Sequence, residues 1–383
     1  MHVNYCGKKL ITQEKTLLMD KVLKELESYL SKDIPYSRVL SSMCTNPHPV
    51  AVKAHCMFVR ANLGDPGLFP GTFELEKKLI SMLGNFFGNS NAVGYVSSGG
   101  TESNIQAIRA ARNVYGKGNI VVPDSAHFSF LKVADLLGIE VKRAKLDDEY
   151  RVDVADVERL VDENTFAIVG IAGTTELGQV DDIKSLSKIA VERDIYLHVD
   201  AAFGGFVLPF LGYKDFDFRV KGVCSIAVDP HKMGLATIPA GVILFRKEEY
   251  LHSLSVETPY LTSTKQYTLT GTRPGTGVAS AYAVLKHLGF DGLRKIVLEC
   301  MRVTKILKEE VEALGLKPVI EPVTNVVCFE CKACRVRELL MKEGWYVSTI
   351  RKPEAIRCVV MPHVTEETVS KFVDSLKRVL RAL

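Results

Sequence analysis

The 383-residue sequence lacks the features that mark membrane, nucleic-acid-binding and secreted proteins. No apolar run approaches the ~18–20 residues that a bilayer-spanning helix needs. The net charge is only +4, and basic residues are interleaved with acidic ones, so neither nucleic acid nor a membrane surface is expected as a partner. The first twenty residues contain no continuous apolar core and no small-residue cleavage site, and we expect no signal peptide.

Cysteine is too sparse and too scattered to build a disulfide framework. The nine cysteines, an odd number, favour reduced thiols in a cytoplasmic protein. Three of them, Cys328, Cys331 and Cys334 in CFECKAC, could suggest a metal site. In a strand, however, Cys328 and Cys331 would point to opposite faces, and a fourth ligand at a sensible spacing is missing. We expect no metal and interpret these residues as core or edge thiols.

Short, nearly all-apolar runs alternate with helical patterns through the middle of the chain. We expect strands in the runs IVVP (120–123), FAIVGIAG (166–173), YLHVD (196–200), SIAV (225–228) and GVILF (241–245). This alternation predicts an α/β fold with a mostly parallel sheet covered by helices on both faces. In such sheets, ligands bind at the edge where the carboxyl ends of the strands meet.

The sequence divides into three predicted parts. A helix and an irregular arm occupy residues 1–50, a large domain residues 51–289, and a small C-terminal α/β domain residues 290–383. In the small domain, the strand-like runs VTNVVCFE (323–330) and IRCVVMP (356–362) flank a helix near 335–343. We expect Thr365 to cap the last helix. Its apolar stripe is formed by Val369, Phe372, Val373, Leu376, Val379 and Leu380.

The run SSGGTESN (97–104) follows a short apolar segment and opens a helical pattern. Small residues let backbone N–H groups approach an anion, and the N-terminus of a helix adds partial positive charge. Thr101 could add a hydroxyl donor. The alternative is a Gly-Gly turn with a helix cap, and the run is not a Walker A loop, which ends in Gly-Lys-Ser/Thr.

Three further polar residues follow predicted strands. His127 in PDSAHFSF lies at the expected ligand edge, where an imidazole could stack on a planar ring. Asp200 ends a strand predicted to be buried, and a buried carboxylate needs a cationic partner such as a protonated heteroaromatic nitrogen. Lys232 in DPHK, if partly desolvated, can form a Schiff base with an aldehyde. The plain alternatives are a structural histidine and a lysine in a surface turn.

One cofactor, pyridoxal phosphate, accounts for all four features. It needs a phosphate-binding loop, a group that covers the ring, an acid opposite the ring nitrogen, and a lysine for its aldehyde. The four features occur in this order along the chain, with the lysine 32 residues after the aspartate. We therefore predict a pyridoxal phosphate enzyme.

The motifs SGGTESN, PDSAHFSF, GTTELG, HVDAAFGG and DPHKMG resemble those of the group II pyridoxal-phosphate-dependent amino acid decarboxylases, which have the pyridoxal-phosphate-dependent transferase fold of type I. The resemblance is greatest to the archaeal L-tyrosine/L-aspartate decarboxylases and extends from 62–72 (NLGDPGLFPGT) to 359–365 (VVMPHVT). It implies a homodimer with active sites at the subunit interface. It also implies cofactor-binding roles for Gly100, Thr101 and His231 (phosphate), His127 and Ala202 (ring), Thr175 (polar contact), Asp200 (ring nitrogen) and Lys232 (aldehyde).

The sequence departs from the family after the lysine. Larger relatives carry a long mobile loop there, with a tyrosine that protonates the product carbon. Here the segment is compact and offers Tyr260 and Tyr267, with His127 as a further candidate.

Substrate recognition calls for an arginine that binds the α-carboxylate. Arg357 in IRCVVMP is the first candidate, and its alternative is a strand arginine that extends to solvent. Arg273 in GTRPGTG is the second candidate and could act across the dimer. The arm SSMCTNPHP (41–49) is expected to line the substrate pocket, with Asn46 and His48 as hydrogen-bonding residues.

The expected reaction is the decarboxylation of an L-amino acid. L-aspartate would give β-alanine for coenzyme A synthesis, and L-tyrosine would give tyramine; the sequence leaves both open. The alternative is another type I pyridoxal phosphate enzyme, either an aminotransferase or a carbon–carbon or carbon–sulfur lyase. A non-catalytic or metal-binding protein, based on the cysteine group, is the competing class.

Overall fold

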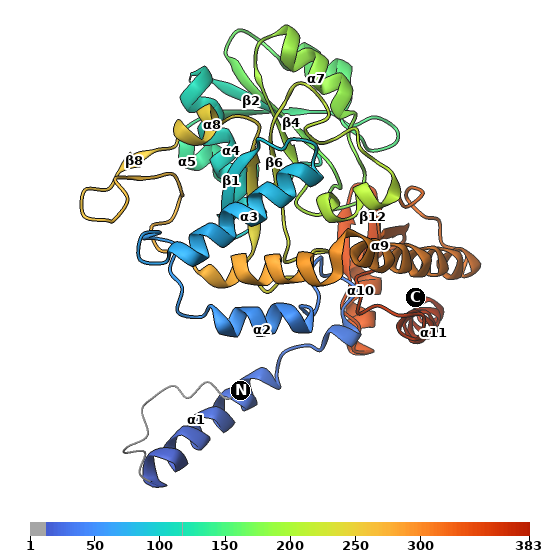
Figure 1. The fold of residues 1–383 in the computed structure, drawn as a ribbon. Coiled ribbons are helices and arrows are strands. Elements are labelled where there is room, and N and C mark those ends of the chain that lie inside the picture. Colours follow the sequence, from blue (N-terminus) through green and yellow to red (C-terminus); the bar gives the residue numbers. More distant parts are fainter. Residues whose placement is uncertain (1–12, 117) are drawn as a thin grey trace.

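The computed structural model describes residues 13–116 and 118–383 (Figure 1). Its centre is a seven-stranded sheet in the order β1-β7-β6-β5-β4-β2-β3, and β7 runs antiparallel to both of its neighbours. The other pairs in this sheet are parallel. The strands are β1 (Val93–Ser97), β2 (Asn119–Pro123), β3 (Glu140–Ala144), β4 (Thr165–Ile171), β5 (Tyr196–Asp200), β6 (Val223–Val228) and β7 (Gly241–Phe245).

Helices cover both faces of the sheet, as predicted. The helices of this part are α2 (Pro49–Met57), α3 (Pro70–Phe86), α4 (Gly100–Tyr115), α5 (Ser129–Leu137), α6 (Val154–Leu160), α7 (Ile183–Glu192) and α8 (Glu248–His252). Strand β4 shows why its sequence is almost wholly apolar: Ala167 and Val169 pack into the core beneath α4 and α5, while Ile168 packs into the opposite core with α7. Gly170 lets α7 approach closely, because a Cβ there would lie 2.4 Å from Ile183 Cδ1.

The five predicted strands of the large sheet are all present, although the strand predicted at 166–173 already ends at Ile171. Strands β1 and β3 were not predicted. Strand β3 lies at the edge of the sheet and has the partly exposed sequence EVKRA, so it lacks the apolar run by which the others were found.

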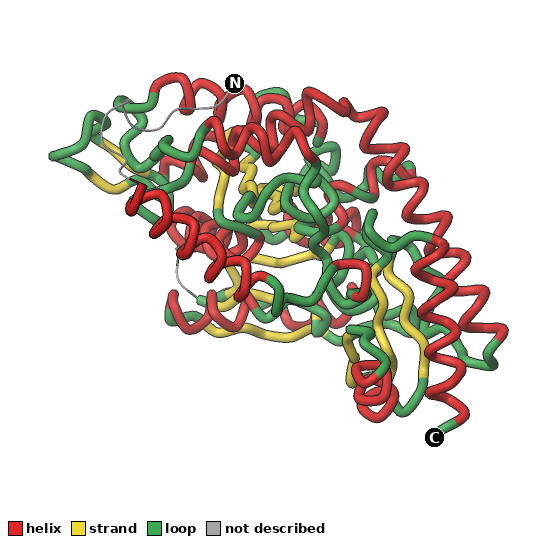
Figure 2. The backbone as a smooth tube through the Cα atoms, turned by 90° about the horizontal axis from the view of Figure 1, so that it is seen from below, coloured by secondary structure: helices red, strands yellow, loops and turns green. Residues whose placement is uncertain are grey.

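The C-terminal part contains a second, antiparallel sheet in the order β10-β12-β11. Its strands are β10 (Val326–Glu330), β11 (Ser348–Arg351) and β12 (Glu354–Val359), and its helices are α10 (Ala333–Lys342) and α11 (Glu366–Arg381). Figure 2 shows this small sheet with helices packed beside it at the C-terminal end of the molecule. Thr365 caps α11 as predicted, since its side chain accepts a hydrogen bond from the Thr368 N–H at 3.2 Å.

A long helix, α9 (Gly275–Ala313), connects the two parts and is interrupted at Gly289, whose φ is 62°. The predicted boundary near residue 290 falls beside this break. Within α9, Leu293, Val297 and Cys300 still pack in the core of the large sheet, whereas Val303, Leu307 and Val311 pack in the core of the small sheet. The division into 51–289 and 290–383 stays a prediction.

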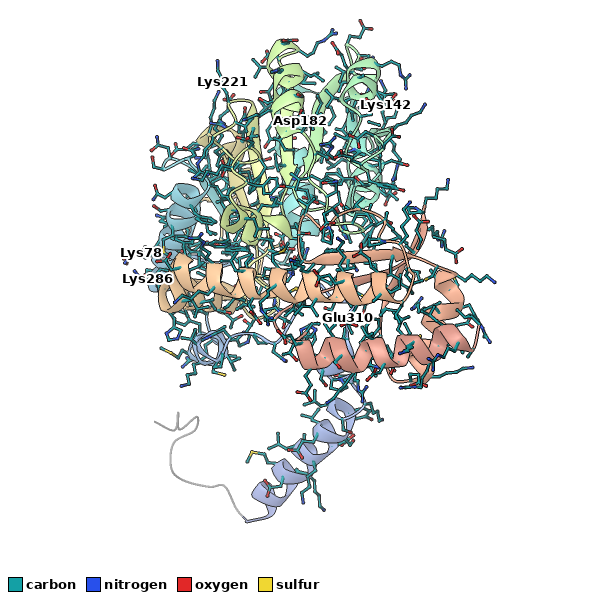
Figure 3. The ribbon with its side chains drawn as sticks, turned by 90° about the vertical axis from the view of Figure 1, so that its right-hand side faces the viewer. Lys78, Lys142, Asp182, Lys221, Lys286 and Glu310 are labelled. Atoms are coloured by element: carbon teal, nitrogen blue, oxygen red, sulfur yellow. The ribbon has the colours of Figure 1, made fainter. Side chains whose placement is uncertain are left out.

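The N-terminal segment contains α1 (Gln13–Leu30), which projects from the rest of the chain (Figures 1 and 3). The arm after it returns to the small domain, where Leu40 is fully buried and Val359 N–H donates to the Leu40 carbonyl at 2.7 Å. The remaining elements are η1 (Tyr36–Arg38), η2 (Gly204–Phe206), η3 (Leu208–Leu211) and the short pair β8 (Val256–Glu257) and β9 (Lys265–Gln266). No helix in the described ranges is long and apolar enough to span a bilayer.

Candidate active site

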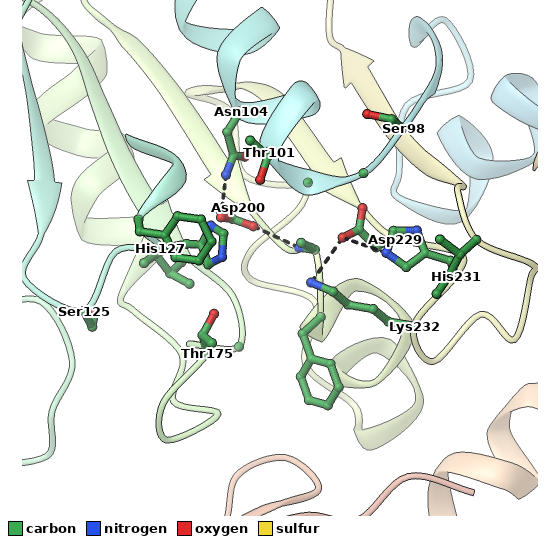
Figure 4. Close-up of a pocket in the computed structure, with 18 residues that line it drawn as sticks. Ser98, Thr101, Asn104, Ser125, His127, Thr175, Asp200, Asp229, His231 and Lys232 are labelled. Carbon is green, nitrogen blue, oxygen red and sulfur yellow. Dashed lines mark hydrogen bonds and ion pairs between the residues drawn. The ribbon is translucent and has the colours of Figure 1, made fainter. Parts of the chain in front are cut away.

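A cavity of ≈ 360 Å³ lies at the carboxyl edge of the large sheet (Figure 4). This volume is within the roughly 300–1,000 Å³ typical of small-molecule sites. Its walls come from the segments that follow β1, β2, β4, β5 and β6, because parallel strands present their carboxyl ends at one edge. All eight residues that the resemblance assigned to the cofactor line it: Gly100, Thr101, His127, Thr175, Asp200, Ala202, His231 and Lys232.

The N-terminus of α4 forms one wall of the cavity. The first N–H groups of an α-helix have no partner within the helix, so those of Gly100 and Thr101 can bind an anion. A Cβ on Gly100 would lie 3.0 Å from Ala202 Cβ and 3.1 Å from Asp229 Oδ2. A side chain at this position would therefore crowd the cavity, and glycine keeps the backbone accessible to a ligand.

The turn after β6 places Lys232 in the cavity wall beside Asp229. Its N–H donates to the Asp229 carbonyl at 3.0 Å, and its Nζ lies 3.1 Å from Asp229 Oδ2. His231 Nε2 lies 3.7 Å from the same oxygen, and its Nδ1 lies 2.8 Å from the Ala240 carbonyl. Asp229 therefore contacts the amine of Lys232 directly (Figure 4).

Asp200 ends β5 and is 6% exposed. Its Oδ2 accepts a hydrogen bond from Asn104 Nδ2 at 2.8 Å, and its Oδ1 accepts one from the Ala202 N–H at 3.1 Å. Both partners are neutral, so neither of them takes the place of a cationic partner from the cavity. The predicted need for a cation is thus consistent with this geometry.

His127 follows β2 and lies in the same wall as Asp200 (Figure 4). Its Nδ1 accepts a hydrogen bond from the Ser129 N–H at 3.2 Å, which orients the ring. Burial lowers the pKa of His127, so the ring is uncharged at neutral pH. A flat, neutral imidazole of this kind is suited to pack against a planar ligand.

Two buried residues beside Asp200 were missed by sequence analysis. Asn104 lies on α4 and His198 on β5, and His198 Nε2 lies 2.9 Å from Asn104 Oδ1. Burial lowers the pKa of His198 to about 4. A histidine within an otherwise apolar strand was the available signal for this pair.

The depressed pKa of His198 predicts a loss of stability in acid. An unfolded histidine has a pKa of about 6.5, so between about pH 6.5 and about pH 4 the unfolded chain binds a proton that the folded chain does not. The contribution of neutral His198 to the free energy of unfolding is fully present above this pH window. It falls by roughly 3 kcal/mol as the pH falls through the window. Denaturant unfolding at several pH values should therefore show a shallower acid slope for His198→Gln than for the wild type. Equal slopes would contradict this assignment.

Six predicted residues do not line the cavity: Tyr260, Asn46, Arg273, Arg357, Tyr267 and His48. Tyr260 is 85% exposed, in the loop between β8 and β9, and Asn46 is also exposed. Arg273 is buried and forms a bidentate ion pair with Glu76, at 2.7 and 3.1 Å, and it also donates to the Val96 carbonyl at 3.0 Å. Arg273 thus braces β1 next to the α4 loop, and the structure gives no support to its role as a substrate ligand.

Arg357, the fourth, is only 6% exposed, so its side chain does not extend to solvent. Its Nη1 donates to the Ser41 carbonyl at 3.1 Å and to Ser348 Oγ at 2.9 Å, while its buried Nε has no partner among the described residues. Both arginine candidates have a buried Nε without a partner among the described residues, but only Arg273 is already paired with a carboxylate there, that of Glu76.

The other candidates also have structural partners. Tyr267 is half-buried beside His252, and His48 caps α2 by accepting from the Val50 N–H at 3.2 Å. In the cysteine group, Cys328 donates to the Glu176 carbonyl at 3.2 Å, whereas Cys334 is exposed. Within residues 13–116 and 118–383, no group of three histidine, cysteine or acidic side chains could hold a metal ion.

The fold and the cavity define a pyridoxal phosphate enzyme of fold type I. The residues fit this cofactor: a crowded glycine lies at the helix N-terminus, a buried carboxylate has only neutral partners, and a lysine amine faces both. The model of the family described as pyridoxal-dependent decarboxylase conserved domain matches residues 56–332. The chain belongs to this family and is therefore a pyridoxal-phosphate-dependent decarboxylase.

Curated relatives place the chain in one branch of the family. A protein of Archaeoglobus fulgidus named a probable L-aspartate decarboxylase is 62% identical over 94% of this chain and 99% of the relative. A protein of Methanothrix thermoacetophila named a probable L-tyrosine/L-aspartate decarboxylase is 56% identical over 97% and 98%. The predicted resemblance to the archaeal branch is thereby confirmed.

Solved structures confirm the fold. A sphingosine-1-phosphate lyase of Burkholderia pseudomallei matches 99% of this chain and 93% of its own, with a TM-score of 0.84 and 27% identity. A glutamate decarboxylase of Lactobacillus brevis matches 100% and 95%, with a TM-score of 0.87 and 23% identity. These likenesses support the type I α/β fold predicted from the motifs.

Proposed function

We propose that the protein decarboxylates L-aspartate to β-alanine, with L-tyrosine, giving tyramine, as the second candidate substrate. The observation that carries this proposal is the 62% identity, over nearly the whole chain, to a relative named for L-aspartate alone. The relatives named for both amino acids, at 50–56% identity, keep L-tyrosine as the alternative. β-Alanine formed in this way would serve coenzyme A synthesis.

The side chains of the cavity divide the work of the reaction. When bound, pyridoxal phosphate supplies a ring that accepts the electron pair left on the α-carbon when CO2 departs. Lys232 would hold its aldehyde, and the N–H groups of Gly100 and Thr101, with His231, its phosphate. Asp200 would hold a proton on its ring nitrogen. Asp229 Oδ2, 3.1 Å from Lys232 Nζ, would bind the ammonium group of Lys232 whenever that amine is free.

Orientation of the substrate decides which bond breaks. The bond to the α-carboxylate must stand perpendicular to the cofactor ring, and holding it there can lower the barrier by several kcal/mol. We propose Arg357 for this task. The arm contacts both Arg357 and the surroundings of Lys232. The Ser41 carbonyl accepts a hydrogen bond from Arg357. Three residues later, burial raises the pKa of the Cys44 thiol, and the positive charge of Lys232 opposes this rise.

Replacing Arg357 by glutamine should lower kcat/KM by roughly 10- to 100-fold, the effect expected when a charged hydrogen bond is lost. Steady-state kinetics with L-aspartate would measure it. Arg351→Gln, on the exposed edge of the same small sheet, is the matched control and should leave the kinetics unchanged. Equal kinetics for both variants would show that the carboxylate is bound elsewhere.

A panel of L-amino acids, assayed for CO2 release without any keto acid, tests the proposed function. The proposal predicts CO2 and β-alanine from L-aspartate, and a slower or comparable release of tyramine from L-tyrosine. Formation of a keto acid would instead indicate an aminotransferase. No CO2 from either substrate would refute the substrate proposal.

We further propose that the protein is a homodimer with its active sites at the interface. Helix α1 supports this because its apolar residues recur every three or four positions and are exposed: Leu18, Met19, Val22, Leu23, Leu26, Tyr29 and Leu30. Such a face is typical of a helix that packs against another surface. The exposed Tyr260 could then serve the partner's site. Sedimentation equilibrium should give the mass of two chains, and a monomer at micromolar concentration would contradict the proposal.

We also propose a cytoplasmic location and an archaeal source. All eight cysteines in the described part of the chain are free thiols, which suits a reducing compartment. The organisms of the relatives support the source.

A further inference from the structure

Asp200 is the last acceptor in a chain of buried hydrogen bonds that runs from β6 through β5 to α4. We propose that Asn104 and His198 are positioning residues, which keep the Asp200 carboxylate aimed at the ring nitrogen of the cofactor. This inference rests on the proposed role of Asp200 as the partner of that nitrogen. It assigns a function through Asp200 to two buried residues, of which Asn104 also lines the cavity.

The network consists of three hydrogen bonds between side chains that are distant in sequence. Ser225 Oγ lies 2.8 Å from His198 Nδ1, His198 Nε2 lies 2.9 Å from Asn104 Oδ1, and Asn104 Nδ2 lies 2.8 Å from Asp200 Oδ2. Asn104 Nδ2 also donates to Ser129 Oγ at 3.0 Å. Every member other than Asp200 is at most 1% exposed, so water does not compete for these bonds.

The direction of each bond follows from the acceptor at its end. An ionised carboxylate only accepts, so the Asn104 amide must present its N–H₂ to Asp200 and its oxygen to His198. His198 must then carry its proton on Nε2, which leaves Nδ1 to accept from the Ser225 hydroxyl. The donors of these three bonds therefore point along the network toward Asp200, whose Oδ2 accepts the last bond.

The side chains of this network add no net charge beside the Asp200 carboxylate. His198 is fully buried and its pKa is lowered to about 4, so it stays neutral at neutral pH. A cationic histidine at this place would offset the charge of Asp200 and weaken its hold on a protonated ring nitrogen. The other ionisable groups that face the cavity are His127, after β2, and Asp229, His231 and Lys232, after β6.

A purely structural role for this network would affect folding but not the cofactor. The two roles can be separated by the protonation of the ring nitrogen, which nitrogen-15 NMR of ring-labelled pyridoxal phosphate in the holoenzyme reports directly. In the wild type, the ring nitrogen should stay protonated throughout the neutral range. In Asn104→Ala and His198→Leu, its proton affinity should fall about 10- to 100-fold, the effect of losing a hydrogen bond to a charged group.

Two variants give the experiment its controls. His198→Gln retains an amide N–H that can reach Asn104, so it should restore most of the proton affinity. Val199→Ala truncates the next residue of β5, which packs on the opposite face of the sheet, and should lower the thermal midpoint without moving the NMR signal. In Asn104→Ala and His198→Leu, kcat should fall together with the proton affinity of the ring nitrogen, while KM changes less than about threefold.

Asp200→Ala separates the role of Asp200 from the positioning roles of Asn104 and His198. If Asp200→Ala shifts the ring-nitrogen signal and the folded Asn104→Ala and His198→Leu holoenzymes do not, the positioning role is wrong and the role of Asp200 stands. If Asp200→Ala itself leaves the signal unchanged, the ring-nitrogen assignment fails and the inference falls with it.

Discussion

Lys232→Ala should abolish decarboxylation, with a loss of roughly 10³-fold or more, because no other described residue of the cavity wall has an amine that can bond the cofactor aldehyde. The variant should also lose the visible absorption band of the covalently held cofactor. Its Asp229 carboxylate, 2% exposed, would lose its ammonium partner, and a modest loss of stability should follow. Absorption spectra and CO2 release from L-aspartate measure both effects.

The matched control is Lys221→Ala. Lys221 is exposed (Figure 3) and lies just before β6, whereas Lys232 follows the same strand. This variant should keep the band and the activity. A Lys232→Ala protein that is still yellow and active would place the reactive amine elsewhere in the chain.

Asp200→Ala should have the second-largest effect, a fall in kcat of roughly 10²- to 10³-fold, the cost of removing one preorganised group that stabilises developing charge. The physical reason is that the ring nitrogen would lose its proton and with it most of the capacity to accept electrons. Lys232 is intact in this variant, so the absorption band should persist with an altered position. Steady-state kinetics and spectra of the loaded enzyme test this combination.

A buried carboxylate away from the cavity controls for simple destabilisation. Asp217 is fully buried and pairs with Arg219, so Asp217→Asn should lower the thermal midpoint and leave kcat unchanged. If Asp200→Ala and Asp217→Asn reduced kcat equally, the effect would belong to folding rather than to the ring nitrogen.

The strands that carry the site could be predicted because they are buried on both faces. IVVP, YLHVD and SIAV are short apolar runs in which neighbouring residues face opposite cores, so their ends were visible in the sequence. The polar residues at or just after the ends of these strands, including Asp200 and Lys232, lie together at one edge of the sheet. The edge strand β3 was missed because Lys142 and Arg143 interrupt its apolar pattern.

Contacts between distant side chains could not be predicted in the same way. Asn104 and His198 are 94 positions apart, and their hydrogen bond depends on where α4 crosses β5. Arg273 and Glu76 are 197 positions apart, and only the structure shows that Arg273 serves β1. The local sequence pattern indicates which residues end strands. Which side chains then contact one another depends on the order of the strands in the sheet and on the placement of the helices.

The most direct test of the central claim is to locate the cofactor on the chain. The holoenzyme is treated with borohydride, digested and mapped by mass spectrometry, which fixes the reduced cofactor to the residue that held it. The account predicts a single phosphopyridoxyl group, on the peptide that contains Lys232. Label on another lysine, or no label on a protein that releases CO2 from L-aspartate, would contradict it.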